Sequence, residues 1–319
     1  MCELLFIYCS KQILFDKQIF NERQETVFLE KTMTEKELYS KKRHIHISSK
    51  HKWFDLKLKE VWRYRDLIWL FTKRSFTVSY KQTILGPAWL FINPIITSII
   101  YAFVFGGIAG IGTDGVPQIL FYLSGTAIWT YFSTCLTKNA NTFTANAGVF
   151  GKVYFPRLTI PISNVLSSVI QFGIQFMMVI TFLVYFLFIG EVSPNWWAFS
   201  LIPLILIHLG LMGMGFGIII SSMTTKYRDL SVLVGFGLSL WMYATPVVYP
   251  LSTLGDSWMK TVLLINPVTM PVEIFRYAVV GKGTINPLYL AVSCIFTFVV
   301  VLFGIVIFNK VERTFMDTV

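Results

Sequence analysis

Six long apolar stretches contain no Asp, Glu, Lys or Arg, and they limit what this chain can fold into more than any other feature. Each is long enough to cross the hydrocarbon core of a bilayer as a helix, which takes about 20 residues. Because a helix satisfies its own backbone hydrogen bonds in lipid, the sequence predicts an all-α membrane protein with six transmembrane helices. The stretches are residues 85–110, 116–137, 158–190, 196–224, 230–250 and 285–309.

The same stretches restrict how the protein can be driven. Charged side chains inside a membrane usually mark proton relays, ion sites or voltage sensors. Here His208 is the one residue of this kind, and we interpret it as a hydrogen-bonded helix contact. The sequence therefore argues against an ion-coupled carrier and predicts an energy source outside these stretches.

The basic residues indicate how the chain is oriented. There are 27 Lys and Arg against 17 Asp and Glu, a net charge of +10. In a six-span topology 24 of the 27 fall on one side, and the other side holds only Lys260, Arg276 and Lys282. The positive-inside rule then predicts that both termini are cytoplasmic. We expect these basic residues to face anionic lipid headgroups and not nucleic acid.

Composition divides the chain into three regions. Residues 1–52 are rich in Lys, Glu, Gln and His, and we expect a poorly ordered basic cytoplasmic arm. Residues 53–82 mix Trp and Leu with Lys and Arg, which is typical of an amphipathic helix at the membrane interface. Residues 83–319 form the predicted six-span transmembrane domain. We predict no metal site, and we expect the histidines of the arm to be solvated: His44, His46 and His51.

The region between the fifth and sixth predicted spans, residues 251–284, is apolar in short pieces only. Its pieces Trp258–Ile265 and Pro271–Val280 are too short to span a bilayer, and Pro267 and Pro271 interrupt them. One additional span would also place the basic C-terminal tail outside. We therefore predict a re-entrant helical hairpin on the extracytoplasmic side, with its irregular backbone buried in protein or lining a cavity.

Motifs for nucleotide binding and catalysis are absent from the sequence. No G-x-x-x-x-G-K-[ST] segment occurs, so we predict that this chain does not bind ATP through a Walker A loop. No pair of carboxylates lies on any predicted span, so no acid and base are available there. We predict no catalytic residue and no cofactor in this chain.

Aromatic residues recur at depths that a belt of interfacial Trp and Tyr does not explain well. Flat aromatic faces suit the C–H faces of sugar rings and allow them to slide. We therefore predict a path for a glycan along Tyr101, Trp129, Trp241 and Tyr249. The alternative is that these side chains belong to the interfacial belt or serve ordinary packing.

Four segments together resemble the permease subunit of type-2 ABC exporters for polysaccharides, the O-antigen and capsule group. The resemblance covers about residues 53–319, and the order of its parts makes it specific. The segments are YKQTILGPAWLFINP (80–94), KYRDLS (226–231), TPVVYP (245–250) and NPVTMPVEIFRYAVVG (266–281).

The resemblance implies a homodimer in the bacterial inner membrane, working with two copies of an ATPase subunit that binds ATP and Mg²⁺. It implies export of an undecaprenyl-diphosphate-linked glycan. A coupling helix would follow the second span, with candidates Asn146, Phe150, Lys152 and Tyr154. The second cytoplasmic loop would contribute Tyr227, Arg228 and Asp229. Candidates for the pyrophosphate and lipid headgroups are Arg63, Arg65, Lys73 and Arg74.

Other function classes remain open at this point. A type-2 ABC permease could carry a different cargo, such as a teichoic polymer, a capsule or a drug. An ion-coupled carrier fits poorly with spans that carry no charge. A membrane-embedded enzyme would be expected to have grouped acidic residues, whereas the candidates are isolated in the sequence: Asp114, Glu191, Asp256 and Glu273.

Overall fold

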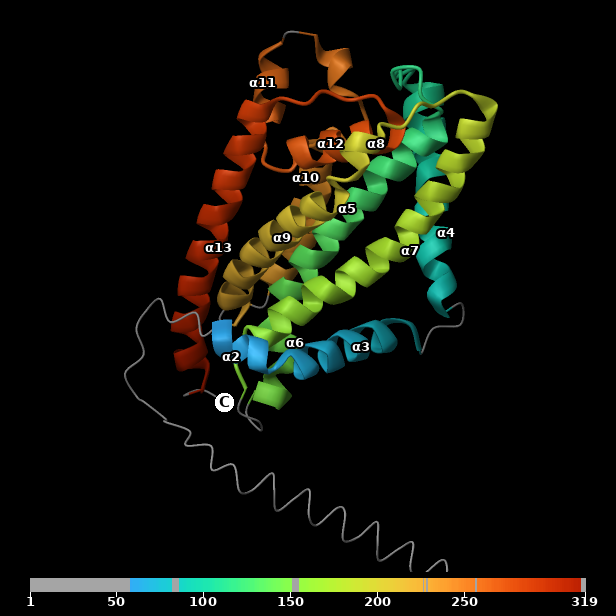
Figure 1. The fold of residues 1–319 in the computed structure, drawn as a ribbon. Coiled ribbons are helices and arrows are strands. Elements are labelled where there is room, and N and C mark those ends of the chain that lie inside the picture. Colours follow the sequence, from blue (N-terminus) through green and yellow to red (C-terminus); the bar gives the residue numbers. More distant parts are fainter. Residues whose placement is uncertain are drawn as a thin grey trace, which may run out of the picture. The chain divides into compact units, whose positions relative to one another are not determined.

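The computed structural model describes residues 58–81, 86–150, 155–225, 227, 229–255 and 257–316. Within these ranges every regular element is a helix, which confirms the predicted all-α class. The predicted arm, residues 1–52, lies outside the described residues. Figure 1 shows the helices packed side by side, with shorter helices at both ends of the bundle.

Five helices are long and apolar enough to cross a membrane. Each coincides with one of the six predicted spans. The first combines α4 with a π-helical continuation, η2, that begins at Ala102. The five are α4 and η2 (Trp89–Ile108), α5 (Gln118–Ala140), α7 (Thr159–Ile189), α9 (Ile202–Thr224) and α13 (Pro287–Met316).

The remaining predicted span, residues 230–250, is helical over only part of its length. Its helix α10 covers Leu230–Tyr243, 14 residues, and is therefore about 21 Å long. Residues 244–250 form turns that lead into a short 3₁₀ helix, η3 (Leu251–Leu254). Pro246 explains the break, because the residue before a proline disfavours the helical conformation.

Two short helices follow at the residues where the sequence predicts them. α11 (Trp258–Ile265) and α12 (Thr269–Val280) meet at 93° across Asn266–Val268. α11 is mostly exposed, whereas nearly all of α12 is buried. α12 packs against α5, α9 and the one-turn helix α8 (Trp196–Phe199).

The centre of the bundle is α5, which is mostly buried and packs against α7, α9 and α12. Small residues of α9 make this close approach possible. A Cβ at Gly217 would lie 2.8 Å from the Leu136 carbonyl oxygen and would overlap the Cβ of Asn139. α9 packs on its other side against α13.

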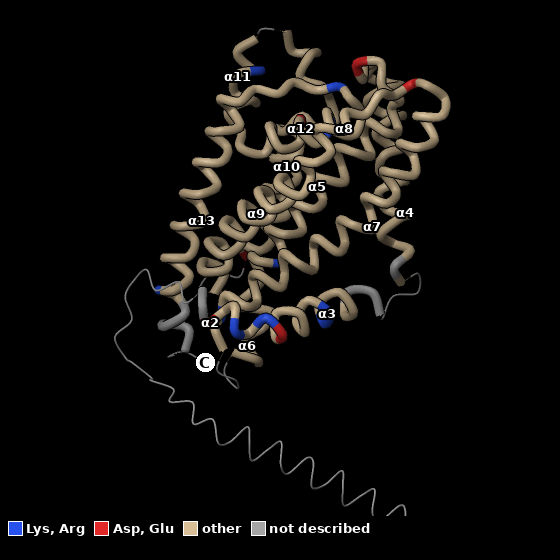
Figure 2. Tube along the Cα trace, viewed as in Figure 1, with Lys and Arg blue, Asp and Glu red and all other residues tan. Residues whose placement is uncertain are grey.

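The short helices at one end of the bundle are α2 (Leu58–Arg63), α3 (Arg65–Lys81) and α6 (Thr142–Phe150), and the C-terminal end of α13 lies there too (Figure 1). α3 packs along α7, with Ile68 and Thr72 buried. α8, α11 and α12 lie at the opposite end (Figure 1). Charged residues gather mainly at these two ends (Figure 2).

Candidate functional site

The predicted coupling segment begins with α6, which is tied firmly to the spans. The backbone N–H of Phe143 donates to Ser221 Oγ of α9 at 3.1 Å. Phe150 is buried and stacks on Phe155 with ring centroids 5.8 Å apart. Asn146 is half-buried and donates to the Thr142 carbonyl. Phe150 therefore anchors the helix, and the exposed positions of α6 are Thr144, Ala145 and Gly148.

Two of the coupling candidates, Lys152 and Tyr154, lie outside the described residues, as does Arg228 of the second loop. Tyr227 and Asp229 of that loop are exposed. They lie between the end of α9 and the start of α10. Since Thr224 Oγ1 of α9 donates to the Ala140 carbonyl at the end of α5, this loop lies at the same end of the bundle as α6.

Two members of the predicted aromatic path meet in the bundle. The rings of Trp129 and Trp241 are 6.4 Å apart in an edge-to-face arrangement. Trp129 is 5% exposed, whereas Trp241 is half-buried and also contacts Phe132 and Phe216. The Trp241 indole N–H donates to Asn266 Oδ1 at 3.1 Å. The cluster therefore joins α5, α9 and α10 to the junction between α11 and α12.

The other two members of the predicted path pack against the same core, and the Tyr101 hydroxyl lies 3.9 Å from Met242 Sδ of α10. Tyr101 packs edge-on against Tyr122, with centroids 6.2 Å apart. Tyr249 donates its hydroxyl to the Tyr243 carbonyl at 2.9 Å, within the turns after α10. Both are half-buried. Among the ring contacts of these four described residues, the tryptophans make the one that joins two members of the predicted path.

The candidate headgroup ligands Arg63, Arg65, Lys73 and Arg74 are all exposed on α2 and α3. Lys73 Nζ lies 5.5 Å from the centre of the Trp69 ring, and Trp69 is itself exposed. On α2 and α3 this surface combines cations with outward-facing apolar side chains, and the interfacial position predicted for residues 53–82 stays a prediction.

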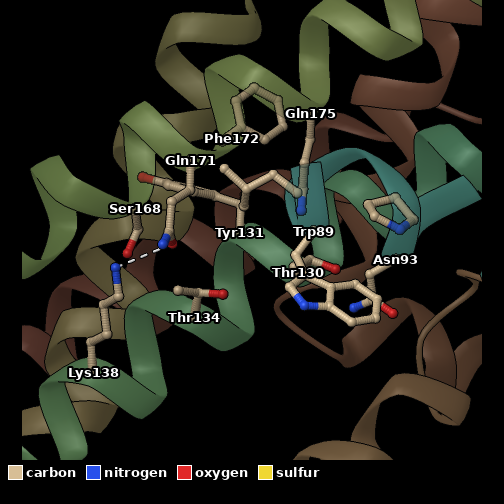
Figure 3. Close-up of a pocket in the computed structure, with 12 residues that line it drawn as sticks. Trp89, Asn93, Thr130, Tyr131, Thr134, Lys138, Ser168, Gln171, Phe172 and Gln175 are labelled. Atoms are coloured by element: carbon tan, nitrogen blue, oxygen red, sulfur yellow. Dashed lines mark hydrogen bonds between the residues drawn. The ribbon is translucent and has the colours of Figure 1, made fainter. Parts of the chain in front are cut away.

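A cavity that sequence reasoning missed lies between α4, α5 and α7 (Figure 3). Its volume is about 560 Å³. Lys138 reaches it from α5, and its ammonium group donates to Ser167 Oγ and Gln171 Oε1 of α7, each at 3.1 Å. The predicted span 116–137 ends one residue before Lys138 and leaves it in the following loop, whereas α5 continues through Ala140.

A second missed feature is an ion pair in the core. Arg276 Nη1 donates to Glu273 Oε1 at 2.7 Å, and the side chains are 2% and 3% exposed. Both residues lie in the predicted short piece Pro271–Val280, but sequence analysis found no reason to pair them and interpreted Glu273 as isolated. Both lie on α12, where an i,i+3 spacing brings them together. A residue pattern could have suggested this pair, but not its burial.

His208 is half-buried, and its Nε2 lies 2.9 Å from Ser293 Oγ of α13. Ser293 in turn donates to the Pro267 carbonyl. This matches the predicted role of His208 as a helix contact. Among the described residues no group of three His, Cys, Asp or Glu is placed to hold a metal ion.

Comparison with known proteins identifies the type of machinery. The chain is 30% identical to a protein named O-antigen export system permease protein RfbA of Klebsiella pneumoniae, over 79% of this chain and 94% of that protein. A protein of the same name from Myxococcus xanthus is 27% identical over 66% of this chain and 78% of its own length. The family model of the ABC-2 type transporter matches residues 66–280. The chain therefore belongs to the ABC-2 type transporter family.

Proposed function

We propose that the protein is the transmembrane subunit of an ATP-driven exporter. Its cargo is an undecaprenyl-diphosphate-linked polysaccharide of the O-antigen type, moved across the bacterial inner membrane. The observation that carries the proposal is the 30% identity to a permease named for O-antigen export. The same identity favours this cargo over a teichoic polymer or a drug.

ATP hydrolysis is assigned to a separate partner, because this chain contains no Walker A sequence. Two copies of an ATPase subunit, binding ATP and Mg²⁺, would face the end of the bundle that carries α3 and α6. The hydrogen bonds of α6 and its neighbours to α9 support this role. A displacement of α6 would be transmitted to α9 through the hydrogen bond between the Phe143 backbone N–H and Ser221 Oγ.

The protein is proposed to work as a homodimer. Apolar side chains of α4 and α10 point outward from the single chain, among them Phe91, Ile96, Val232 and Phe236. Such faces suit a second copy as well as lipid. In the dimer, the aromatic side chains around Trp241 would form part of the glycan path.

The proposed topology places both termini, α3 and α6 on the cytoplasmic side. α2 and α3 would lie in the headgroup plane, supported by their mixture of exposed cations and exposed Trp62, Trp69 and Leu70. α11 and α12 would form the re-entrant hairpin on the opposite side. The 93° bend and the burial of α12 support this placement.

The test uses the purified chain with and without its ATPase in liposomes that contain the glycan lipid. We expect no ATP hydrolysis by the chain alone, and glycan translocation only when chain, ATPase and ATP are all present. A protonophore and a sodium ionophore should leave translocation unchanged. Translocation that stops with the ionophores and continues without ATP would instead identify an ion-coupled carrier.

A further inference from the structure

The cavity between α4, α5 and α7 has polar walls made from regularly spaced side chains. On α5, Thr134 and Lys138 are four residues apart and share one face. On α7, Gln171 and Gln175 share a face in the same way. α4 contributes Asn93 (Figure 3). A volume of about 560 Å³ lies within the roughly 300–1,000 Å³ that is common for small-molecule sites.

Lys138 brings a positive charge to this cavity. Its two hydrogen-bond acceptors, Ser167 and Gln171, are neutral. No ion pair of Lys138 occurs among the residues that the structure describes. An ammonium group has three N–H donors, so one remains available. When the neighbours of a cation at the edge of a bilayer are all neutral, the cation attracts an anion strongly.

Gln175 is a second, independent indication of a ligand. Its side chain is 6% exposed and lines the cavity (Figure 3). In the described part of the chain its amide has no hydrogen-bond partner. Its amide atoms are not among the fully buried polar atoms that lack a partner, so they are accessible from the cavity and can donate to a polar ligand there.

The proposed position of α3 in the headgroup plane puts the cavity close to the lipid headgroups. α3 meets α7 at Ser163, whose carbonyl accepts from Thr72 Oγ1 at 3.4 Å. Gln171 lies eight residues further along α7, which is about 12 Å at the rise of an α-helix. With α3 in the headgroup plane, as proposed above, the cavity wall at Gln171 lies about two helical turns along α7 from the contact between α3 and α7.

We propose that this cavity binds a phosphoryl anion, with Lys138 as its cationic ligand and Gln175 and Asn93 as neutral donors. This inference rests on the proposed function for the identity of the anion, which we assign to the diphosphate of the glycan lipid. The exposed cations of α2 and α3 would attract that diphosphate to the surface, and the cavity would then hold it while the glycan enters the path.

The test measures lipid binding to the purified permease–ATPase complex by native mass spectrometry. The probes are undecaprenyl-diphosphate-linked glycan and phosphatidylglycerol, with inorganic pyrophosphate as competitor. The variants are Lys138→Met, Lys138→Arg and Gln175→Leu. The control is Lys310→Met, which removes the same charge from an exposed position on α13.

We expect Lys138→Met to weaken binding of the glycan lipid by about ten- to a hundred-fold, as for a lost hydrogen bond to a charged group. Lys138→Arg should restore most of the binding, Gln175→Leu should weaken it less, and Lys310→Met should leave it unchanged. Pyrophosphate should displace the glycan lipid from the unaltered complex. If the Lys138→Met variant does not assemble with the ATPase, glycan-lipid binding by the Lys138→Arg and Gln175→Leu variants tests the inference.

Unchanged binding in Lys138→Met and Gln175→Leu, with normal export, would overturn the inference and leave the proposed function intact. Equal losses of phosphatidylglycerol and glycan lipid would support an anion site but overturn its assignment to the export substrate. Binding that depends on Lys138, in a complex that translocates no glycan, would support the site and overturn the proposed function.

Discussion

At the scale of single residues, the ion pair of Arg276 and Glu273 joins three segments at one end of the bundle. Arg276 Nη2 donates to the carbonyls of Pro246 and Val247, at 2.7 and 3.1 Å. Glu273 Oε2 accepts the backbone N–H of Thr284 at 3.1 Å. The pair thereby fixes the turns after α10 and the segment before α13 to α12.

We predict that Arg276→Met destabilises the protein by about 3–5 kcal/mol, because it leaves the buried Glu273 carboxylate without its cation. Thermal unfolding of the purified protein in detergent measures the effect. Lys282→Met is the control, since this lysine is exposed close to α12. The double variant Glu273→Met/Arg276→Met should recover part of the loss. A single variant as stable as the control would show that the pair contributes little.

Gly217 tests the packing of α9 on α5. An added methyl group would meet the Leu136 carbonyl and the Asn139 side chain, so we predict that Gly217→Ala costs about 1–3 kcal/mol. Gly235→Ala on α10 is the matched control, because a Cβ there meets nothing within 4 Å and removes only glycine's flexibility. Unfolding midpoints that move together in both variants would contradict this account of the contact.

At the scale of elements, the sequence predicts helices well where length and apolarity alone decide. Five spans and both short helices appear at the predicted places, although the fourth predicted span, 196–224, is divided into α8 and α9. Pro246 already signals in the sequence that α10 ends early, but what binds the freed carbonyls of Pro246 and Val247 is Arg276, about 30 residues away in sequence. Such a contact depends on tertiary packing and has no local signature.

The candidate sites also divide into residues that a local sequence pattern predicts and residues whose position depends on tertiary packing. The exposed cations of α3 are visible in the sequence, because an amphipathic pattern predicts an outward face. Lys138 was missed because charge counting favours a loop at that position. Its side chain instead points back along α5 to α7, the usual direction for a long side chain in a helix. The burial of the Trp129 side chain likewise results from the helices that pack around α5, which no local pattern shows.

α6 is the element on which coupling can be tested. We predict that Thr144→Cys and Gly148→Cys, both at exposed positions of α6, crosslink to cysteines on the ATPase with a short bifunctional reagent. Lys282→Cys, at the opposite end of the bundle, should give no crosslink. The crosslinked band is read on a denaturing gel with and without ATP. A crosslink from Lys282→Cys alone would place the ATPase at the wrong end for this proposal.

At the scale of the whole molecule, α10 decides on which side of the membrane the C-terminus lies. α10 is only 14 residues long, yet the chain passes from one end of the bundle to the other between α9 and α11 (Figure 1). The end of α9 lies beside α6, since Thr224 Oγ1 donates to the Ala140 carbonyl. The turns of residues 244–250 supply the length that the helix lacks, and Arg276 binds the carbonyls of Pro246 and Val247 inside the protein.

This crossing predicts that a reporter fused after Val319 reads cytoplasmic and one inserted at Gly255 reads periplasmic. An insertion at Gly148 serves as the cytoplasmic reference, because α6 lies beside the C-terminal end of α13 (Figure 1). Alkaline phosphatase and a fluorescent protein at each position give opposite signals and so check each other. Same-side readings at Gly255 and Val319 would mean that the chain crosses an even number of times between them. In that case the α11–α12 pair would be a span and not a re-entrant hairpin.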